Sequence, residues 1–593
     1  MKTASLPDLA RLERTLRTAR QKLLDARTAG GFWEGRLSSS ALSTATAAVA
    51  LEIVRRRGGP DSGDLVARGL QWLTGHQNAD GGYGDTTDSP SNPSTTALCW
   101  AALGLRPEGA AAFARAEAWL RRALGDLSPP AFASAIASRY GDDRTFSVPI
   151  LVLAALAGRL GDGPEAWDAI PALPFELATL PRALFRWLDL QVVSYALPAL
   201  IAIGQAQHAH RPSRNPVARL VRSLARARTL RTLEAIQPAS GGFLEATPLT
   251  SFVTMCLASI GLTGHPVARR GVEFLRASAR PDGSWPIDTN LATWVTTLSV
   301  GALARSGPPL PEADRRALRA WLLAQQTRTV HPYTGSPPGG WAWTDLSGGV
   351  PDGDDTPGAL LALDLLRDAV DPEADRAAEA GVRWLLDLQN RDGGVPTFCR
   401  GWGKLPFDRS CPDLTAHAAR AWSAWRPRLG GGRLARRVDR ALERAFAYLS
   451  RAQRADGSWV PLWFGNQAAP NEENPVYGTS RVLRAAGLPA GAAARGLRWL
   501  EAAQHPDGGF GAAPGVPPTI EETALAVEAL AAAGGSPDAV ARGAGWLAER
   551  TEEGRRFEPS PIGLYFARLW YSEALYPVIF TVAALGRALD RRP

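Results

Sequence analysis

Gln77-Asn-Ala-Asp-Gly-Gly-Tyr83 is the stretch on which the fold prediction rests, because it recurs along the chain. Further copies are Gln237-Pro-Ala-Ser-Gly-Gly-Phe243, Gln389-Asn-Arg-Asp-Gly-Gly-Val395, Gln453-Arg-Ala-Asp-Gly-Ser-Trp459 and Gln504-His-Pro-Asp-Gly-Gly-Phe510. Partial copies are Gly30-Gly-Phe-Trp33, Arg280-Pro-Asp-Gly-Ser-Trp285 and Gly339-Gly-Trp341. An Asp-Gly turn of this kind closes a helix C-terminus, with glycine supplying the positive φ. The Gln amide can then tie the end of one helix to the start of the next.

The segments between these turns have the period of helices. They are rich in Ala, Leu and Arg, and the strand signal is nearly absent, so the sequence predicts an all-α protein. The intervals leave room for a helix pair each. Repeated helix pairs either close into a toroid, the (α/α) barrel, or stack into an open solenoid. The repeats alone leave both arrangements open.

Length and charge restrict the classes of protein. At 593 residues the chain is too long for one compact core, so we expect two large domains. The formal charge is +8, but no Lys/Arg block is interleaved with aromatics, so no nucleic-acid partner is expected. A basic surface would still favour an anionic membrane face.

Cysteine usage and the N-terminus indicate a reducing compartment. Cys99, Cys256, Cys399 and Cys411 have no C-x-x-C spacing, which predicts neither a disulfide framework nor a zinc ribbon. Residues 1–27 are typical of a basic amphipathic helix without the apolar region of a signal peptide. The most apolar stretch, 192–204, is shorter than a bilayer requires. We expect no membrane span.

An acidic turn, Pro351-Asp-Gly-Asp-Asp-Thr-Pro357, precedes an apolar helical segment. Thr356 is suited to the N-cap and Pro357 to the first helical position. Asp352, Asp354 and Asp355 would then share a helix N-terminus, where coupled carboxylates retain a proton that general-acid chemistry can use. Two other interpretations are a capped turn in solvent and a calcium loop, although the EF-hand ligand pattern is missing.

The repeats and the acidic turn together resemble the squalene–hopene and oxidosqualene cyclases. Their QW motif is Q-x-x-x-G-x-W and their acid motif is D-x-D-D-T-A, with Pro357 replacing the Ala here. The resemblance covers Gly30 to about Arg587. It implies two (α/α) barrels side by side with a cavity between them. The implied domains are residues 30–290 and 291–593, with the helix of residues 1–29 packing on the second barrel.

The resemblance also implies roles for the acid and its neighbours. Asp354 would protonate a terminal alkene, with Asp352 and Asp355 beside it. Asp413-Leu-Thr-Ala-His417 is similar to the D-V-T-A-H segment of the hopene cyclases, so His417 would bind the acid and carry positive charge. Tyr477, in Val-Tyr-Gly-Thr, would take part in re-protonating it.

A zinc site is the competing interpretation of the same segment. Cys411, Asp413 and His417 include the ligand types of the protein prenyltransferase β subunits, which are also (α/α) barrels. The Asp-x-Cys pair of that family is absent, so we expect neither a metal nor another cofactor.

Aromatic side chains are expected to form the cavity wall. Indole and phenyl faces stabilise a carbocation, by about 0.5–2 kcal/mol each, without offering a lone pair. By position in the family, the cavity residues would be Trp294, Trp343, Phe398 and Trp463. The loop 462–477 carries Asn466, Gln467, Glu472 and Glu473 and is expected near the acid. The C-terminal aromatics of 564–577 cannot be aligned with the family, which leaves the product open.

The sequence thus predicts an enzyme, an isomerase or lyase that folds a linear isoprenoid, foremost squalene, into a polycycle. It would act as a monotopic protein on the inner face of the cell membrane, with a homodimer left open. One alternative is a cyclase of a shorter prenyl diphosphate or a prenylated aromatic. Another is a non-catalytic (α/α) scaffold that binds isoprenoids, which predicts an exposed acidic turn and a His417 far from Asp354.

Overall fold

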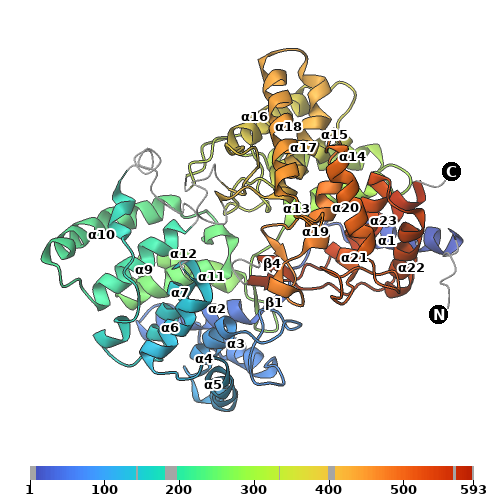
Figure 1. Cartoon of the computed structure of the whole chain (residues 1–593). Helices are drawn as coiled ribbons and strands as arrows, with labels where there is room; N and C mark the ends of the chain where they lie inside the picture. The colour runs from blue at the N-terminus through green and yellow to red at the C-terminus, as the bar shows by residue number, and fades with distance from the viewer. Residues whose placement is uncertain are drawn as a thin grey trace.

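The protein is described from a computed structural model, which covers residues 9–141, 144–180, 196–332, 334–398, 408–564 and 569–590. Figure 1 shows two groups of helices with short strands between them. Cys399 and residues 565–568 of the C-terminal aromatic stretch lie outside the described ranges.

The first group of helices closes into a ring. Its members are α2 (Ala41–Arg56), α3 (Gly63–Gly75), α4 (Pro93–Leu103), α5 (Ala110–Leu124), α6 (Pro129–Tyr140), α7 (Arg144–Leu156), α9 (Leu197–His210), α10 (Pro216–Ile236), α11 (Thr247–Ser259) and α12 (Pro266–Ala277). The inner helices contact one another in the order α2, α4, α7, α9 and α11, and α11 returns to contact α2. The other helices lie outside them.

The second group closes in the same way. Its members are α13 (Ala292–Leu303), α14 (Glu312–Ala324), α15 (Asp355–Leu366), α16 (Pro372–Leu388), α17 (Pro412–Trp425), α18 (Arg433–Ala452), α19 (Pro475–Leu483), α20 (Ala490–Ala502), α21 (Ile520–Ala533), α22 (Pro537–Arg550) and α23 (Tyr576–Asp590). The inner helices α13, α15, α17, α19, α21 and α23 contact in sequence, and α23 contacts α13. Both rings are therefore closed, and the solenoid interpretation is wrong.

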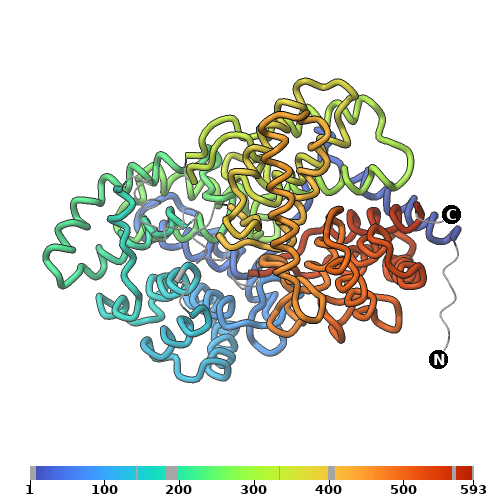
Figure 2. The backbone as a smooth tube through the Cα atoms, turned by 45° about the horizontal axis from the view of Figure 1, so that its top comes forward, coloured from blue at the N-terminus to red at the C-terminus, as the bar shows by residue number. Residues whose placement is uncertain are grey.

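The N-terminal helix α1 (Leu9–Asp25) packs against α22 and α23. Leu12, Leu16 and Leu23 are buried in the same core as the second ring. Figure 2 shows α1, in blue, beside the red C-terminal helices after the molecule is turned. The exact domain limits that the sequence suggested, at 29/30 and 290/291, stay a prediction.

Inner and outer helices differ in how they are buried. In α2 every side chain from Ala41 to Val54 is buried, and most of them are apolar, as expected for a helix enclosed by others. In the outer helix α18 only one stripe is buried, which contains Leu434, Val438, Ala445 and Leu449. The sequence pattern thus sorts helices into the two layers of each ring.

The Gln of each repeat performs the predicted tie between helices. Gln389 Nε2 donates to the carbonyl of Gly393 in its own turn, at 2.8 Å, and to that of Ala441 in α18, at 2.9 Å. The same pair of bonds is made by Gln77, Gln237, Gln453 and Gln504. Gln326 does this for the partial copy at Gly339, from thirteen residues upstream.

A threonine on an inner helix packed against the turn completes each joint, and the sequence did not indicate it. Thr356 Oγ1 accepts from the backbone N–H of Trp341 at 3.0 Å. The equivalent pairs are Thr44–Trp285, Thr96–Tyr83, Thr250–Phe243, Thr296–Trp33, Thr415–Val395, Thr479–Trp459 and Thr523–Phe510. A buried backbone N–H needs a partner, and these hydroxyls supply it.

Thr356 is therefore not the N-cap that the sequence indicated. Helix α15 begins at Asp355, two residues earlier than expected, and Asp352 Oδ1 accepts from the N–H groups of Asp354 and Asp355 at 2.8 and 2.7 Å. The prediction failed because the hydroxyl of Thr356 is already committed to Trp341.

Short strands link the two rings. β1 (Ser39–Ser40) pairs with β2 (Trp285–Pro286), and β3 (Phe464–Gly465), β4 (Ile562–Leu564) and β5 (Leu569–Tyr571) form an antiparallel sheet in that order. Trp570 N, on β5, donates to Asp85 of the first ring at 2.9 Å. This sheet carries residues of the C-terminal segment to the space between the rings.

None of the helices in the described ranges combines the length and the apolar character needed to cross a bilayer.

Candidate active site

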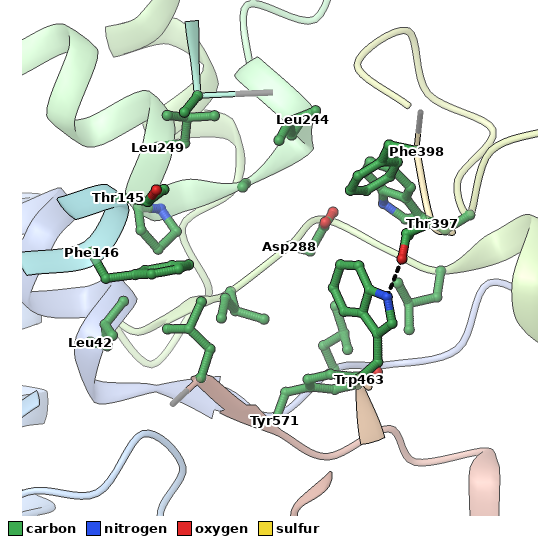
Figure 3. Close-up of a pocket in the computed structure, with 18 of the residues that line it drawn as sticks. Leu42, Thr145, Phe146, Leu244, Leu249, Asp288, Thr397, Phe398, Trp463 and Tyr571 are labelled. Carbon is green, nitrogen blue, oxygen red and sulfur yellow. Dashed lines mark hydrogen bonds between the residues drawn. The ribbon is translucent and has the colours of Figure 1, made fainter. Parts of the chain in front are cut away.

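A cavity of about 360 Å³ lies between the two rings. The first ring and its loops contribute Leu42, Phe146 and Leu249, whereas Phe398 and Trp463 come from loops of the second ring. Figure 3 shows these side chains facing one another across the cavity, with Asp288 between them. The lining is almost wholly apolar, and no Lys or Arg is part of it within the described residues.

The acidic turn lies at this cavity, and its middle carboxyl is the most open. All three Asp side chains contribute to the lining. The Asp354 side chain is 19% exposed, whereas Asp352 and Asp355 are 3% and 4% exposed. The hydrogen bonds from the N–H groups of Asp354 and Asp355 hold Asp352 against the helix N-terminus. Asp354 is thus free to present its carboxyl to a bound molecule.

His417 lies next to this carboxyl, as the sequence predicted. Its Nδ1 is 3.0 Å from Asp354 Oδ1, and the two residues come from α17 and the start of α15. The side chain is 9% exposed. The contact arises because α15 and α17 are adjacent inner helices of the second ring. Both features contradict the scaffold interpretation, which expected a solvent-exposed turn and a distant His417.

Burial holds a proton at the acidic turn near neutral pH. It raises the pKa of Asp354 to about 6, although the Arg481 guanidinium acts in the opposite direction. Burial raises the pKa of Asp352 to about 7, with a further contribution from the charge of Asp354. The pKa of Asp355 is raised well above its ordinary value, first by burial and then by Asp352. A shared proton is the expected result of such coupling.

The surroundings of His417 disfavour the positive charge that the sequence led us to expect there. Burial lowers the pKa of its ring well below the ordinary value, and the guanidinium groups of Arg420, Arg481 and Arg484 lower it further. A buried imidazole near three guanidinium groups favours its neutral form, because desolvation and like charge both disfavour the protonated one.

The four aromatic residues that the sequence selected all line the cavity: Trp294, Trp343, Phe398 and Trp463. The ring of Phe398 lies 6.2 Å from that of Trp343 and 5.9 Å from that of Trp463, the latter edge-on. Trp463 Nε1 donates to Thr397 Oγ1, which Figure 3 marks with a dashed line. Trp294 Nε1 donates to Tyr576 Oη at 3.0 Å. The N–H groups of these two indoles are thereby held.

Tyr477 lies behind the wall instead of in it. It is buried on α19, its ring packs 4.7 Å from that of Phe464, and its Oη accepts from Arg481 Nε at 3.2 Å. It is not among the residues that line the cavity. The hydrogen bond described for Tyr477 Oη is thus made with Arg481 and not with the acid.

The loop 462–477 turns only its aromatic part to the cavity. Trp463 and Phe464 line it, whereas Asn466 Nδ2 donates to Glu522 at 3.0 Å and Glu473 pairs with Arg454 at 2.8 Å. The polar contacts of Asn466 and Glu473 are thus made with residues outside the acidic turn.

Several lining residues escaped the sequence reading. Tyr571 and Tyr576 come from the C-terminal stretch that could not be aligned, and Phe146 comes from α7 of the first ring. Asp288 follows the partial repeat that ends at Trp285. Its pKa is raised well above the ordinary value, first by burial and then by the charge of Glu245. Only the aromatic richness of the C-terminal stretch could have indicated the two tyrosines.

Cys411, Asp413 and His417 do not form a metal site. Cys411 Sγ bonds to Asp413, whereas His417 turns to Asp354. In the part of the chain that the structure describes, no cluster of three or more His, Cys, Asp or Glu residues is placed to hold a metal ion.

Family models decide the identity of the fold. The model of the squalene-hopene cyclase C-terminal domain matches residues 291–590, and that of the N-terminal domain matches residues 16–132. The chain belongs to the squalene–hopene cyclase family. This family match, like the closed rings, confirms the resemblance that the repeats and the acidic turn had indicated.

The names of individual relatives of this chain indicate different products. A drimenyl diphosphate synthase from Streptantibioticus cattleyicolor is 32% identical over 327 residues, which are 52% of this chain and 56% of that protein. The squalene hopane cyclase afumA from Aspergillus fumigatus is 25% identical over 590 residues, 81% of this chain and 75% of its own.

A solved structure shares the fold over the whole length. It is an ent-copalyl diphosphate synthase from Streptomyces platensis, with a TM-score of 0.57, 21% identity, and coverage of 98% of this chain and 99% of that one. Among curated relatives, the chain spans between 28% and 56% of the length of three that it matches.

Proposed function

We propose that the protein is a class II terpene cyclase in which Asp354 protonates a terminal alkene of a linear isoprenoid. The observation that carries this proposal is the position of Asp354. It is the one carboxyl of the acidic turn with appreciable exposure at an aromatic cavity, and its Oδ1 contacts His417.

The proton transfer follows from this geometry. A neutral His417 with its proton on Nδ1 donates to Asp354 Oδ1, which leaves Oδ2 as the oxygen that holds the acid's proton. The proton adds to the less substituted carbon of a trisubstituted alkene, a tertiary cation forms, and the next double bond attacks it. The aromatic walls stabilise each successive cation, and the last one loses a proton or captures water.

The character of the lining favours a hydrocarbon substrate, and we infer squalene. A diphosphate buried in the cavity would need cations to compensate its charge. The described lining offers carboxyl groups at Asp288 and the acidic turn, and no Lys or Arg. The second candidate is a shorter prenyl diphosphate, which the 32% identity to the drimenyl diphosphate synthase favours. A prenylated aromatic would also fit an apolar cavity, without the need for cations.

The test is product formation from defined substrates. Purified protein would be incubated with squalene, farnesyl diphosphate and geranylgeranyl diphosphate, and the extracts analysed by gas chromatography and mass spectrometry. We expect a polycyclic product from squalene, lost in Asp354→Asn and kept in the matched control Asp364→Asn. Asp364 lies on the same helix but is 28% exposed and pairs with Arg367.

Two other outcomes of this experiment would contradict the proposal. Turnover of a diphosphate alone would reject squalene in favour of the second candidate. A folded protein that binds all three compounds without converting any would overturn the enzymatic proposal and favour the isoprenoid-binding scaffold.

The surface of α10 supports a peripheral position on a membrane. Val217, Leu220 and Leu224 are 67%, 60% and 73% exposed and follow the i, i+3, i+7 spacing of one helix face. The same helix is rich in arginine, which suits anionic lipid head groups. Figure 1 shows α10 at the outer edge of the first ring, away from the second. The proposed location is the inner face of the cell membrane, which would supply an apolar substrate; a homodimer stays a prediction.

A further inference from the structure

A buried cation lies behind the cavity wall. Arg481 is on α19, one helical turn after Tyr477, and is 7% exposed. Its Nε donates to Tyr477 Oη at 3.2 Å. Its guanidinium lies over the ring of Tyr477, at 5.2 Å from the centroid, and over the ring of Trp294, at 5.8 Å. Trp294 therefore contacts both this cation and the cavity.

Arg481 lacks the partner that a buried charge ordinarily has. Its neighbour Arg484, one turn later, forms an ion pair with Glu528 at 2.7 Å. Arg481 has no carboxylate within ion-pair distance among the described residues, and its Nη2 is buried without a hydrogen-bond acceptor there. An unpaired buried charge is costly unless something nearby compensates it.

Two carboxyls, Asp354 and Glu528, act on Arg481 by their charge. Glu528 is already paired with Arg484, so the carboxyl left to compensate Arg481 is Asp354, once it has lost its proton. Burial alone would lower the pKa of Arg481, but Tyr477 and Asp354 raise it above the ordinary value, so the guanidinium stays charged. The same attraction acts on the carboxyl, because Arg481 opposes the rise in the pKa of Asp354. Before proton transfer Arg481 faces a neutral acid, and after it a carboxylate.

We propose that Arg481 is a positioning residue that supplies the permanent positive charge of the acid site and thereby strengthens Asp354 as a proton donor. This rests on the proposed function of the cavity. His417 is neutral and holds one carboxyl oxygen, whereas Arg481 supplies the charge that stabilises the carboxylate left behind. The rings of Trp294 and Tyr477 lie against the guanidinium, so that the cation acts without entering the cavity.

Other titratable groups also face Asp354 and must stay constant in any test. They are Asp352 and Asp355 beside it, Asp413 and His417 on α17, Tyr477 on α19, and Tyr571 on β5. Around Arg481 lie Arg420, Arg484 and Glu528. Replacing Arg481 removes one cation and leaves these carboxyls in place, so the pKa of Asp354 is expected to rise.

The test compares Arg481→Gln and Arg481→Lys with the wild type. The measurement is the initial cyclisation rate against pH, with whichever isoprenoid the wild type converts. Asp354 must be protonated to act, so activity is present below its pKa and is lost above it. In Arg481→Gln we expect the alkaline limb to move to higher pH while the rate on the acid side falls about tenfold for each pKa unit of acidity lost. Arg481→Lys should restore both in part.

A limb that moves to higher pH together with a lower rate on the acid side distinguishes an electrostatic role of Arg481 from a structural one. A lower rate with an unmoved limb, or with a limb moved to lower pH, would overturn the proposal, as would an unchanged profile. Arg484→Gln is the matched control, because it removes a buried arginine of the same helix that is already paired. We expect it to lower the thermal midpoint without moving the limb.

A second readout does not depend on turnover. The carbonyl band of protonated Asp354 is identified by infrared difference against Asp354→Asn, and its loss with rising pH is followed in the wild type and in Arg481→Gln. The band should persist to higher pH in the variant. If the wild type converts no isoprenoid, the proposed function fails, yet this titration still decides whether Arg481 acts on Asp354.

Discussion

At the scale of the residue, the acid site is a set of groups whose charges are set by burial. Asp354 keeps its proton up to about pH 6, well above the ordinary range of an Asp carboxyl, because burial raises its pKa. His417 is neutral for the same reason. One mechanism, desolvation, thus raises the pKa of the acid and lowers that of its partner. Protonated Asp354 and neutral His417 form a hydrogen-bonded pair without formal charge. The permanent cation, Arg481, lies behind the cavity wall.

The first prediction at this scale concerns pH. Because the pKa of Asp354 is raised to about 6, and the protonated form is the active one, the cyclisation rate should be highest below pH 6. It should decline as the pH rises through that value. The measurement is the initial rate between about pH 4.5 and 8.5, with the thermal midpoint recorded at each pH as a control for unfolding. A rate that increases from pH 5 to 8 would contradict Asp354 as the proton donor.

At the scale of the element, the repeat is a joint between helices with three parts. The Gln amide ties a helix end to the next helix, glycine turns the chain, and a threonine of the following inner helix accepts from the backbone N–H of the last residue of the turn. Gly393, in the third repeat, has a φ of 93° and lies so close to the carbonyl of Arg444 that a side chain would collide with it. Each joint therefore fixes the angle between successive helices, and the rings close.

Removing one tie should destabilise its ring. Gln389→Ala leaves the carbonyls of Gly393 and Ala441 without their donor in a buried position. We expect a cost of about 1–3 kcal/mol, the usual penalty for unsatisfied buried polar groups, seen as a lower thermal midpoint. Gln21→Ala is the control, because that side chain is exposed on α1 and its bond within the described part of the chain is to the nearby Asp25. Equal midpoints for the two variants would show that the tie contributes nothing.

At the scale of the whole molecule, two closed rings enclose a cavity that neither ring forms alone. The second ring contributes the acid and most of the aromatic wall, whereas the first contributes apolar side chains such as Phe146, Leu249 and Phe252. The link through Trp570 and Asp85 helps to hold the rings in register. The exposed face of α10 lies on the first ring, so the proposed membrane contact and the acid belong to different halves of the protein.

The membrane contact is tested on intact protein. Leu220→Glu combined with Leu224→Glu places charge on the exposed face of α10 and should reduce co-flotation with anionic phospholipid vesicles several-fold. Activity in detergent should be unchanged, because neither residue lines the cavity. Val370→Glu is the matched control, since Val370 is 82% exposed on the second ring. Equal flotation of the double variant and the wild type would reject α10 as the contact.

The sequence by itself determined everything that depends on local spacing. The repeats specified helix pairs and their joints, and the acidic turn with the Asp413–His417 segment selected a carboxyl and an imidazole that the fold brings together, 3.0 Å apart. Trp294, Trp343, Phe398 and Trp463 were found because the short segments around them resemble those of the family. These features can be predicted from the sequence because each lies within a single turn or helix.

Only the tertiary structure decided the charges and the far side of the cavity. Burial and the approach of Arg481 and Arg484 from the end of α19 favour the neutral form of His417, and no local pattern records either effect. Thr356 bonds to Trp341 instead of capping its helix, Tyr477 lies behind the wall, and Arg481 meets the acid site from α19. Asp288 and Phe146 reach the cavity only when the rings come together. Burial and long-range contacts exist only in the folded chain. The acidity of Asp354 therefore could not be predicted from the sequence.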